Sequence, residues 1–99
     1  MRIYHIVRPG VWSNFRGTHY EAESLAGEGF IHCSFADQLD AVLKRYYSGD
    51  DEVIVLEIDP AKLDAKLVVE PSTGGEKYPH IYGTINRDAI VGEQRRKIT

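Results

Sequence analysis

The sequence predicts a mixed α+β domain with one long helix and one or two short helices. Short stretches rich in β-branched residues, separated by Pro and Gly, indicate strands. One segment carries apolar residues at the three- and four-residue spacing of an amphipathic helix. The chain has 99 residues, of which 42% are hydrophobic. This composition supplies enough apolar surface to offset the entropy of ordering, and the length fits one domain spanning residues 1–99.

The first half of the chain is expected to alternate strands with helices. A β-rich stretch predicts the first strand over residues 2–7, and apolar residues at helical spacing predict a short helix within residues 9–17. Ser24 can cap a one-turn helix that closes at Gly29. A second strand should then cover residues 30–33.

The long helix is expected to begin at Ser34. Serine is a preferred N-cap residue, and Asp37 stands three residues later, as in a capping box. The segment that follows is apolar on one face and charged on the other, and Gly49 ends it. One stripe should therefore pack inward, formed by Phe35, Leu39, Val42, Leu43, Tyr46 and Tyr47.

The second half is expected to consist of strands. Residues 53–58 form a nearly continuous apolar run, which is typical of a strand buried on both faces and predicts the central strand. Residues 67–70 predict another strand, and residues 71–75 a flexible loop rich in Pro, Ser and Gly. Two short strands should follow, at residues 80–83 and 89–91.

Charge and cysteine content exclude several classes of protein. A formal net charge of -3 argues against a protein held on nucleic acid by bulk electrostatics, although residues 95–97 are basic. The single cysteine, Cys33, rules out an intramolecular disulfide and a Cys-rich zinc module. No apolar run approaches the about 20 residues that span a bilayer. We therefore expect a soluble cytoplasmic protein that has neither a membrane nor a nucleic acid as its partner.

Three of the four histidines, His5, His32 and His80, fall in predicted strands beside aromatic residues. Imidazole is well suited to proton transfer near neutral pH, and strands aim side chains more rigidly than loops. A single strand histidine is more often a hydrogen-bonded residue at the edge of the core. Three of them together favour a shared site, so we expect them to converge on one concave surface.

Alternation along the second strand adds Ser34 to this surface. His32 and Ser34 should point to one side and Cys33 to the other, where it would serve the core as a small hydrophobic residue. Ser34 also has an ordinary role as the cap of the long helix. The positive end of that helix would then face an anionic ligand.

Arg8, Tyr20 and Tyr82 extend the candidate site. Arg8 follows the first strand and can supply charge-assisted hydrogen bonds, and the two tyrosines lie in loops or short edges. A metal site built from the three histidines and Glu70 is chemically permissible. No paired spacing such as HExxH supports it, and no G-x-S-x-G motif supports a serine hydrolase.

Several strings of this sequence resemble domain-of-unknown-function family 952, a group of small bacterial proteins. The resemblance runs over nearly the whole chain. The most specific strings are Glu28-Gly29-Phe30-Ile31-His32-Cys33-Ser34 and Tyr78-Pro79-His80-Ile81-Tyr82-Gly83, and weaker matches are Ile3-Tyr4-His5-Ile6, Trp12, Ser24-Leu25 and Leu56-Glu57-Ile58-Asp59.

The resemblance implies the ADP-ribosyltransferase fold, which RNA 2'-phosphotransferases share. That fold is a split, strongly bent mixed sheet that grips nicotinamide adenine dinucleotide (NAD) in a central cleft. Its first-strand histidine holds a ribose hydroxyl, a role that falls to His5 here. The second sequence motif of that fold corresponds to His32 or Ser34 in this chain. The third falls near His80, Tyr82 or Glu70.

Three functions remain open at this stage. The first is an enzyme that acts on NAD or a related phosphoribosyl nucleotide, as a transferase or glycohydrolase, through an oxocarbenium-like state. The second is a non-catalytic nucleotide-binding module, and the third is a histidine-based or metal-assisted hydrolase. We expect a small-molecule nucleotide as partner, NAD as a substrate rather than a cofactor, and no bound metal. The candidate catalytic residues are His32, His80 and Glu70, and the candidate ligand-binding residues are His5, Tyr20, Ser34, Tyr82 and Arg8.

Overall fold

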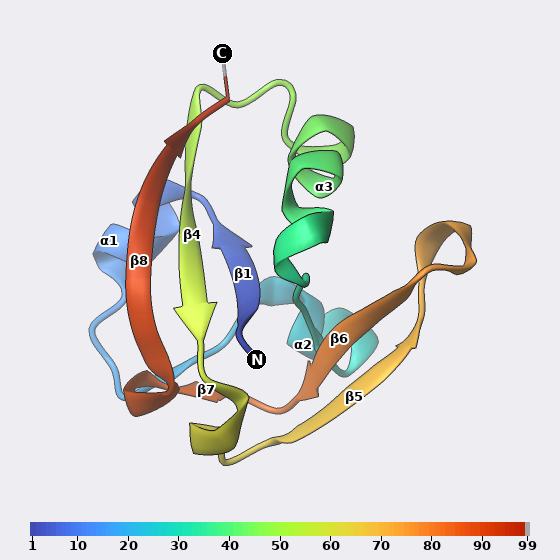
Figure 1. The fold of residues 1–99 in the computed structure, drawn as a ribbon. Coiled ribbons are helices and arrows are strands. Elements are labelled where there is room, and N and C mark those ends of the chain that lie inside the picture. The colour runs from blue at the N-terminus through green and yellow to red at the C-terminus, as the bar shows by residue number, and fades with distance from the viewer. Residues whose placement is uncertain (99) are drawn as a thin grey trace.

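The strands form three small antiparallel sheets (Figure 1). A computed structural model describes residues 1–98, apart from the side chain of Thr73. The first sheet has the order β1 (Ile3–Val7), β4 (Glu52–Ile58), β8 (Ile90–Lys97), and the second pairs β2 (His19–Tyr20) with β7 (Ile85–Asn86). The third has the order β3 (Ile31–His32), β6 (Lys77–Tyr82), β5 (Lys66–Pro71). The expected split arrangement is found, but every pairing within residues 1–98 is antiparallel rather than mixed.

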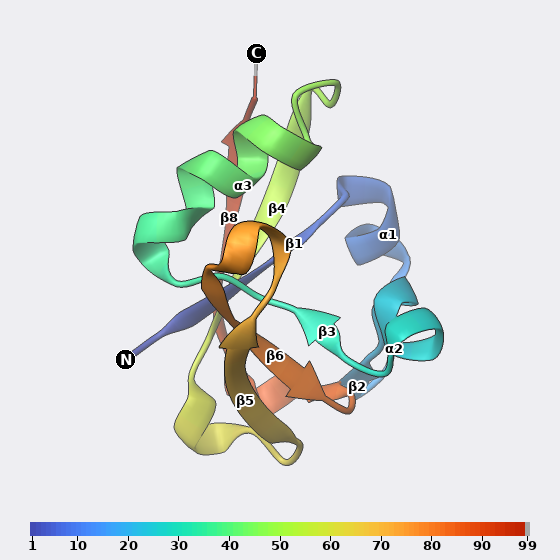
Figure 2. The ribbon, with the colours of Figure 1, turned by 90° about the vertical axis from the view of Figure 1, so that its right-hand side faces the viewer.

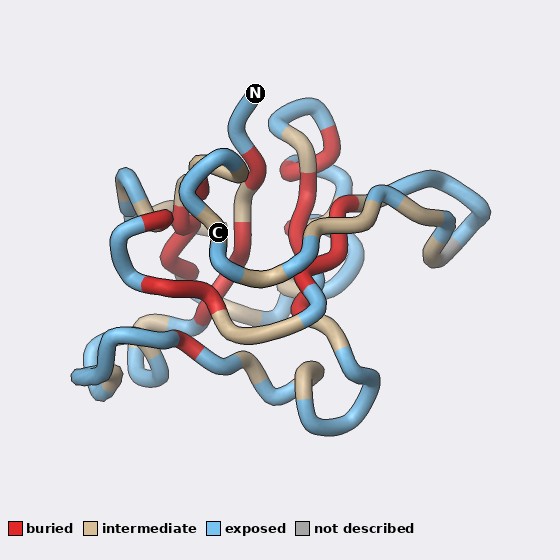
Figure 3. Tube along the Cα trace, turned by 90° about the horizontal axis from the view of Figure 1, so that it is seen from below, coloured by how far each residue is buried: buried red, intermediate tan, exposed pale blue. Residues whose placement is uncertain are grey.

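Strand β4 is the central strand, as its apolar run predicts. Its side chains alternate between two hydrophobic clusters. Ile54, Leu56 and Ile58 pack into the larger cluster, whereas Val53 and Val55 pack into the smaller one beneath α3 (Leu39–Tyr46). Both faces of the strand are therefore buried, which explains why its sequence shows no polar alternation. Figure 3 shows the buried stretches gathered in the middle of the molecule, with exposed loops around them.

The long helix begins later than the sequence predicts. A 3-10 turn over Ala36–Gln38 leads into α3, and the backbone N–H of Phe35 donates to the side-chain oxygen of Gln38 at 2.9 Å. Ser34 is not the cap, because its backbone is paired with the backbone of Tyr4 through two hydrogen bonds of 2.8 Å. The expected anion site at a helix start capped by Ser34 is lost with this correction.

The inward stripe of the helix is confirmed in its central part only. Leu39 and Leu43 are buried in the smaller hydrophobic cluster, and Val42 and Tyr47 are packed against it. Tyr46 is 54% exposed, contrary to the prediction. The helical segment is short, since it covers only residues 36–46, and it ends at the exposed Tyr46.

Two short helices lie beside the strands (Figure 2). Helix α1 (Pro9–Asn14) starts at the predicted proline, and α2 (Glu23–Glu28) ends at Gly29, whose φ of 89° lies in the left-handed region that favours glycine. The N-cap of α2 is Ala22 rather than Ser24. The Ser24 hydroxyl instead donates to the Phe30 carbonyl at 2.9 Å, which ties the helix to the strand that follows it.

Strands β5 and β6 form a hairpin that projects from the body of the molecule (Figure 1). The predicted loop lies at its tip, as a 3-10 turn over Thr73–Gly75. The amide of Gln38, buried at the start of the helical segment, donates to the Glu76 carboxylate and to the Lys77 carbonyl, both at 2.8 Å. This one side chain therefore connects the hairpin to the helix.

The last strand is longer than the predicted residues 89–91. Strand β8 is an edge strand whose outer residues are mostly polar and exposed, so its sequence lacks the apolar pattern by which buried strands are recognised. The two-residue strands β2 and β7 were not predicted either. Within residues 1–98, no helix has both the length and the apolar character needed to cross a membrane.

Candidate functional site

A cavity of about 540 Å³ opens between β1, α2 and the C-terminal end of α3. Its polar wall comes from both sides of the bridge between Tyr4 and Ser34, which joins the β1 sheet to the β3 segment. This junction brings together residues that are far apart in the sequence. The polar residues that line the cavity are Tyr4, His5, Arg8, Tyr20, Glu23, Ser24, Glu28, His32, Ser34 and Tyr47.

A second cavity, of about 480 Å³, lies between α3 and the β5–β6 hairpin. Three tyrosines, Tyr46, Tyr47 and Tyr78, contribute to its walls. It shares six lining residues with the first cavity, so the two form one continuous cleft. The shared residues are Arg8, Glu28, His32, Ser34, Val42 and Tyr47.

His5 is buried in the wall of the first cavity and is held in one tautomer. Its Nδ1 lies 2.7 Å from the His32 carbonyl oxygen, which can only accept, so Nδ1 carries the proton. Nε2 then presents a lone pair, and the Tyr20 hydroxyl lies 3.4 Å from it. Burial lowers the pKa of His5 to about 4 and raises the pKa of Tyr20 to about 12. Both groups are therefore neutral near pH 7.

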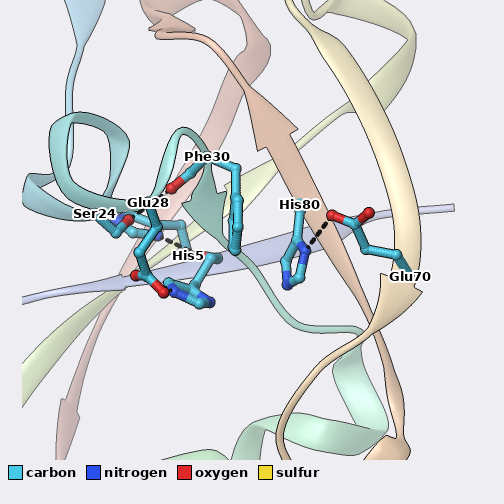
Figure 4. Close-up of polar contacts among 7 residues, drawn as sticks. His5, Ser24, Glu28, Phe30, Glu70 and His80 are labelled. Carbon is cyan, nitrogen blue, oxygen red and sulfur yellow. Dashed lines mark hydrogen bonds and ion pairs between the residues drawn. The ribbon is translucent and has the colours of Figure 1, made fainter.

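His32 lies at the boundary between the two cavities and is paired with a carboxylate. Its Nε2 is 2.8 Å from Oε2 of Glu28, and both side chains are about half exposed. The ring of His32 contacts Phe30 and His80, with centroid separations of 4.9 and 5.4 Å. Figure 4 shows Glu28 on one side of Phe30 and His80 on the other.

His80 takes part in a separate, more buried pair. Its Nδ1 lies 2.7 Å from the Glu70 carboxylate, which also accepts a hydrogen bond from the Tyr82 hydroxyl. These two hydrogen bonds, with that from Tyr82 the stronger, lower the pKa of Glu70. The ring of His80 stacks on Phe30 at 4.1 Å, and its buried Nε2 has no hydrogen-bond partner among the described residues.

Arg8 lies at the rim of both cavities. Its guanidinium forms a two-point contact with Asp50 at 3.1 and 3.2 Å and lies 5.1 Å from the centre of the Tyr47 ring. The hydrogen bond to Asp50 raises the pKa of Arg8 further above its already high value. Arg8 therefore places a permanent positive charge, fixed in orientation by two neighbours, at the mouth of the cleft.

The structure brings together five of the candidate residues on the wall of the first cavity, and three others lie elsewhere. The five are His5, Arg8, Tyr20, His32 and Ser34. His80, Glu70 and Tyr82 line neither cavity, so the three histidines are neighbours but only two of them face the cleft. No group of three or more metal-ligating side chains among residues 1–98 is arranged to hold a metal ion.

Cys33 faces the hydrophobic core, on the opposite side of the strand from the exposed His32. Burial raises the pKa of its thiol, which keeps it protonated. This agrees with the structural role expected from strand alternation.

Sequence reasoning missed Glu28 and Tyr47 as lining residues. Tyr47 packs against the smaller hydrophobic cluster, as its place in the inward stripe predicts, and it also lines both cavities. Glu28 lies four residues before His32, and the left-handed Gly29 between them reverses the chain. That spacing across a glycine is the signal that could have identified the pair.

Comparison with known proteins shows which family and fold the chain shares. No curated protein matches it. The crystal structure of protein CC0527 from Caulobacter crescentus is similar, with a TM-score of 0.84 and 24% identity over 96% of this chain and 85% of that one. The solution NMR structure of CC0527 has a TM-score of 0.74 and 23% identity, over 94% and 82% of the two chains. At this level of identity the likeness shows a shared fold. Residues 6–93 match the family described as "Protein of unknown function (DUF952)", and the chain therefore belongs to the DUF952 family.

Proposed function

We propose that the cleft binds NAD or a related phosphoribosyl nucleotide. The observation that carries the proposal is the neutral imidazole of His5, which directs Nδ1–H at a backbone carbonyl and leaves Nε2 as a hydrogen-bond acceptor in the wall of the cavity. A ligand hydroxyl is the complementary donor, and ribose supplies two of them side by side.

Tyr20 suits the same ligand chemistry. Its hydroxyl lies 3.4 Å from His5 Nε2, a distance longer than the usual hydrogen bond to a hydroxyl. A ribose hydroxyl that approaches both groups from the cavity can donate to His5 and accept from Tyr20. Because burial keeps both side chains neutral, the ribose does not have to displace a charge.

Arg8 supports a phosphate at the mouth of the same cavity. A guanidinium has five N–H donors, and the contact with Asp50 occupies two of them. Charge-assisted hydrogen bonds to phosphate oxygens are stronger than neutral ones, so Arg8 can hold an anionic ligand on a protein of net negative charge. A cavity of about 540 Å³ lies in the range of ordinary small-molecule sites.

The choice of NAD as the first compound to test rests on the resemblance of the His5 and His32 segments to proteins of the ADP-ribosyltransferase fold. Isothermal titration calorimetry with NAD, ADP-ribose and plain ribose tests the proposal. We expect NAD and ADP-ribose to bind at least tenfold more tightly than ribose. The difference corresponds to about 1.4 kcal/mol or more, the contribution expected of the phosphate contacts.

Matched variants test the role of His5. His5→Asn should weaken ADP-ribose binding about tenfold or more, whereas His19→Asn, which removes an exposed histidine outside the cleft, should leave it unchanged. Tyr20→Phe keeps the ring in the core and removes only the hydroxyl, so it should weaken binding without loss of the fold. Equal binding of ribose and ADP-ribose to the native protein would contradict the proposal.

A further inference from the structure

We infer that Glu28 and His32 form the reacting pair of a glycohydrolase centre, which hydrolyses the bond between C1' of a bound ribose and the nitrogen of its base. This inference rests on the nucleotide-binding function proposed above. It adds an activity, and it adds Glu28, which neither the sequence patterns nor the family resemblance assigns.

The position of the pair within the cleft supports this inference. Glu28 and His32 belong to the small set of residues that line both cavities. A ligand that places its ribose against His5 in the first cavity and its base among the tyrosines of the second has its glycosidic bond at this boundary. The reacting bond would then lie beside the one carboxylate–imidazole pair that faces the cleft among residues 1–98.

The pair is held in place by its surroundings. The left-handed Gly29 turns the chain so that Glu28 returns to His32, with 2.8 Å between Oε2 and Nε2. The His32 backbone is fixed by the hydrogen bond from His5 and by pairing opposite His80 in the β3–β6 ladder. The rings of Phe30 and His80 contact the His32 ring. A catalytic group that is positioned in advance loses less freedom when the reaction occurs.

The hydrogen bond fixes the chemistry that each member can perform. The ionised carboxylate of Glu28 can only accept, so it keeps the His32 proton on Nε2 and leaves Nδ1 free to act as a base. His32 would take a proton from the attacking water, and Glu28 would stabilise the resulting imidazolium and the positive charge that develops on the ribose.

The proposed step is balanced for NAD. The bond between C1' and the nicotinamide nitrogen breaks, and its electron pair neutralises the leaving nicotinamide. The water oxygen forms the new bond to C1', and its proton passes through His32 to solvent. The products are nicotinamide, ADP-ribose and one proton, with no oxidant or further co-reactant.

Glu70, the carboxylate expected from the resemblance, is less suited to this role. Its carboxylate is already engaged by both His80 and Tyr82, and it lines neither cavity. His80 contacts the His32 ring edge to face, so the Glu70–His80 pair would support the position of His32 rather than meet the ligand. His80 and Glu70 are positioning residues in this scheme.

The test measures nicotinamide release from NAD by the full chain, together with calorimetric binding of ADP-ribose. Glu28→Gln should lower kcat at least 100-fold while the Kd for ADP-ribose stays within threefold. Glu21→Gln is the matched control, because Glu21 is an exposed glutamate just before the same helix and lines neither cavity. It should retain kcat within twofold. His32→Asn should also lower kcat at least 100-fold, because it removes the proposed base.

The two measurements separate the possible failures. A native protein that binds ADP-ribose but releases no nicotinamide overturns the glycohydrolase inference and leaves the binding function intact. Full activity in Glu28→Gln, or an equal loss in Glu21→Gln, removes the pair from the reaction. A native protein that binds neither NAD nor ADP-ribose contradicts the proposed function itself.

Discussion

Acid should destabilise this protein in a pH range where most carboxylates remain ionised, and His5 should be the cause. Its ring is buried, and burial lowers the pKa in the folded protein to about 4, from an ordinary value of 6.5. Between these two pH values the unfolded chain binds a proton that the folded chain does not. The stabilisation from keeping His5 neutral is therefore complete above pH 6.5 and is lost as the pH falls toward 4.

The size of the effect follows from the two pKa values. For one group with these two pKa values, the free energy of unfolding is lower than at neutral pH by about 2 kcal/mol at pH 5 and by about 3 kcal/mol at pH 4. Glu70 adds acid sensitivity of its own, because its pKa is lowered in the folded protein. The stabilisation from Glu70 is present when the pH is above 4.5, the ordinary pKa of the side chain, and is lost as the pH falls below it. Measurements between pH 7.5 and pH 5 therefore separate the contribution of His5 from that of Glu70.

Urea unfolding followed by circular dichroism, at pH 7.5 and at pH 5.0, provides the assay. The native protein should lose about 2 kcal/mol more than His5→Asn between the two pH values, because the variant lacks the buried imidazole whose pKa is lowered on folding. His19→Asn, which removes an exposed histidine, should keep the native pH dependence. The same pH dependence in the native protein and in His5→Asn would refute the assignment of a buried, neutral His5.

Three further predictions concern the framework around the cleft. Ile81→Ala empties a fully buried site and should lower the free energy of unfolding by about 3 kcal/mol, measured by urea denaturation. Gly83→Ala should cost about 1–3 kcal/mol, because φ is 155° there and the new Cβ would lie 2.8 Å from Cβ of Ala65. Adding Ala65→Gly should recover part of this loss in the same assay. Gln38→Ala should cost about 1–2 kcal/mol and should accelerate amide hydrogen exchange at the tip of the β5–β6 hairpin, beside Glu76.

The sequence predicts an element well when the burial of its side chains leaves a regular apolar pattern along the chain. The central strand is buried on both sides, so its apolar run was sufficient to identify it. The edge strand β8 has an exposed outer edge, and its run of charged residues carries no such pattern. Strand Ile90–Lys97 could be identified only from its partner β4, and strand partners are not visible in a single sequence.

The start of the long helix shows how a tertiary contact overrides a local preference. Ser34 and Asp37 form a sound capping pattern, but both backbone hydrogen-bonding groups of Ser34 are used by Tyr4 of the first strand. The helical segment can therefore begin only after this bridge, and Gln38 supplies the acceptor for the Phe35 N–H in place of a cap side chain. The bridge joins residues 30 positions apart, so no local rule reveals it.

The candidate site was predictable where strand alternation governs it. His5 and His32 could be assigned to a common surface from their strands, and both line the first cavity. Glu28 was not predicted as a site residue, because a glutamate at the end of a short helix is ordinarily solvated. The Glu70–His80 pair depends on the β5–β6 register, in which Glu70 lies opposite Tyr78 and reaches diagonally to His80.

The different surroundings of the three strand histidines suit them to different tasks. His5 is buried without a carboxylate, so it stays neutral near pH 7 and can form directional hydrogen bonds but cannot act as an acid. His32 has a carboxylate partner and a half-exposed ring, so it can exchange protons with water in the cleft. His80 has a carboxylate partner but a buried ring, so water does not reach it. A proton-transfer step in this cleft therefore requires His32, and the Glu28 variant is the most direct way to separate that step from binding at His5.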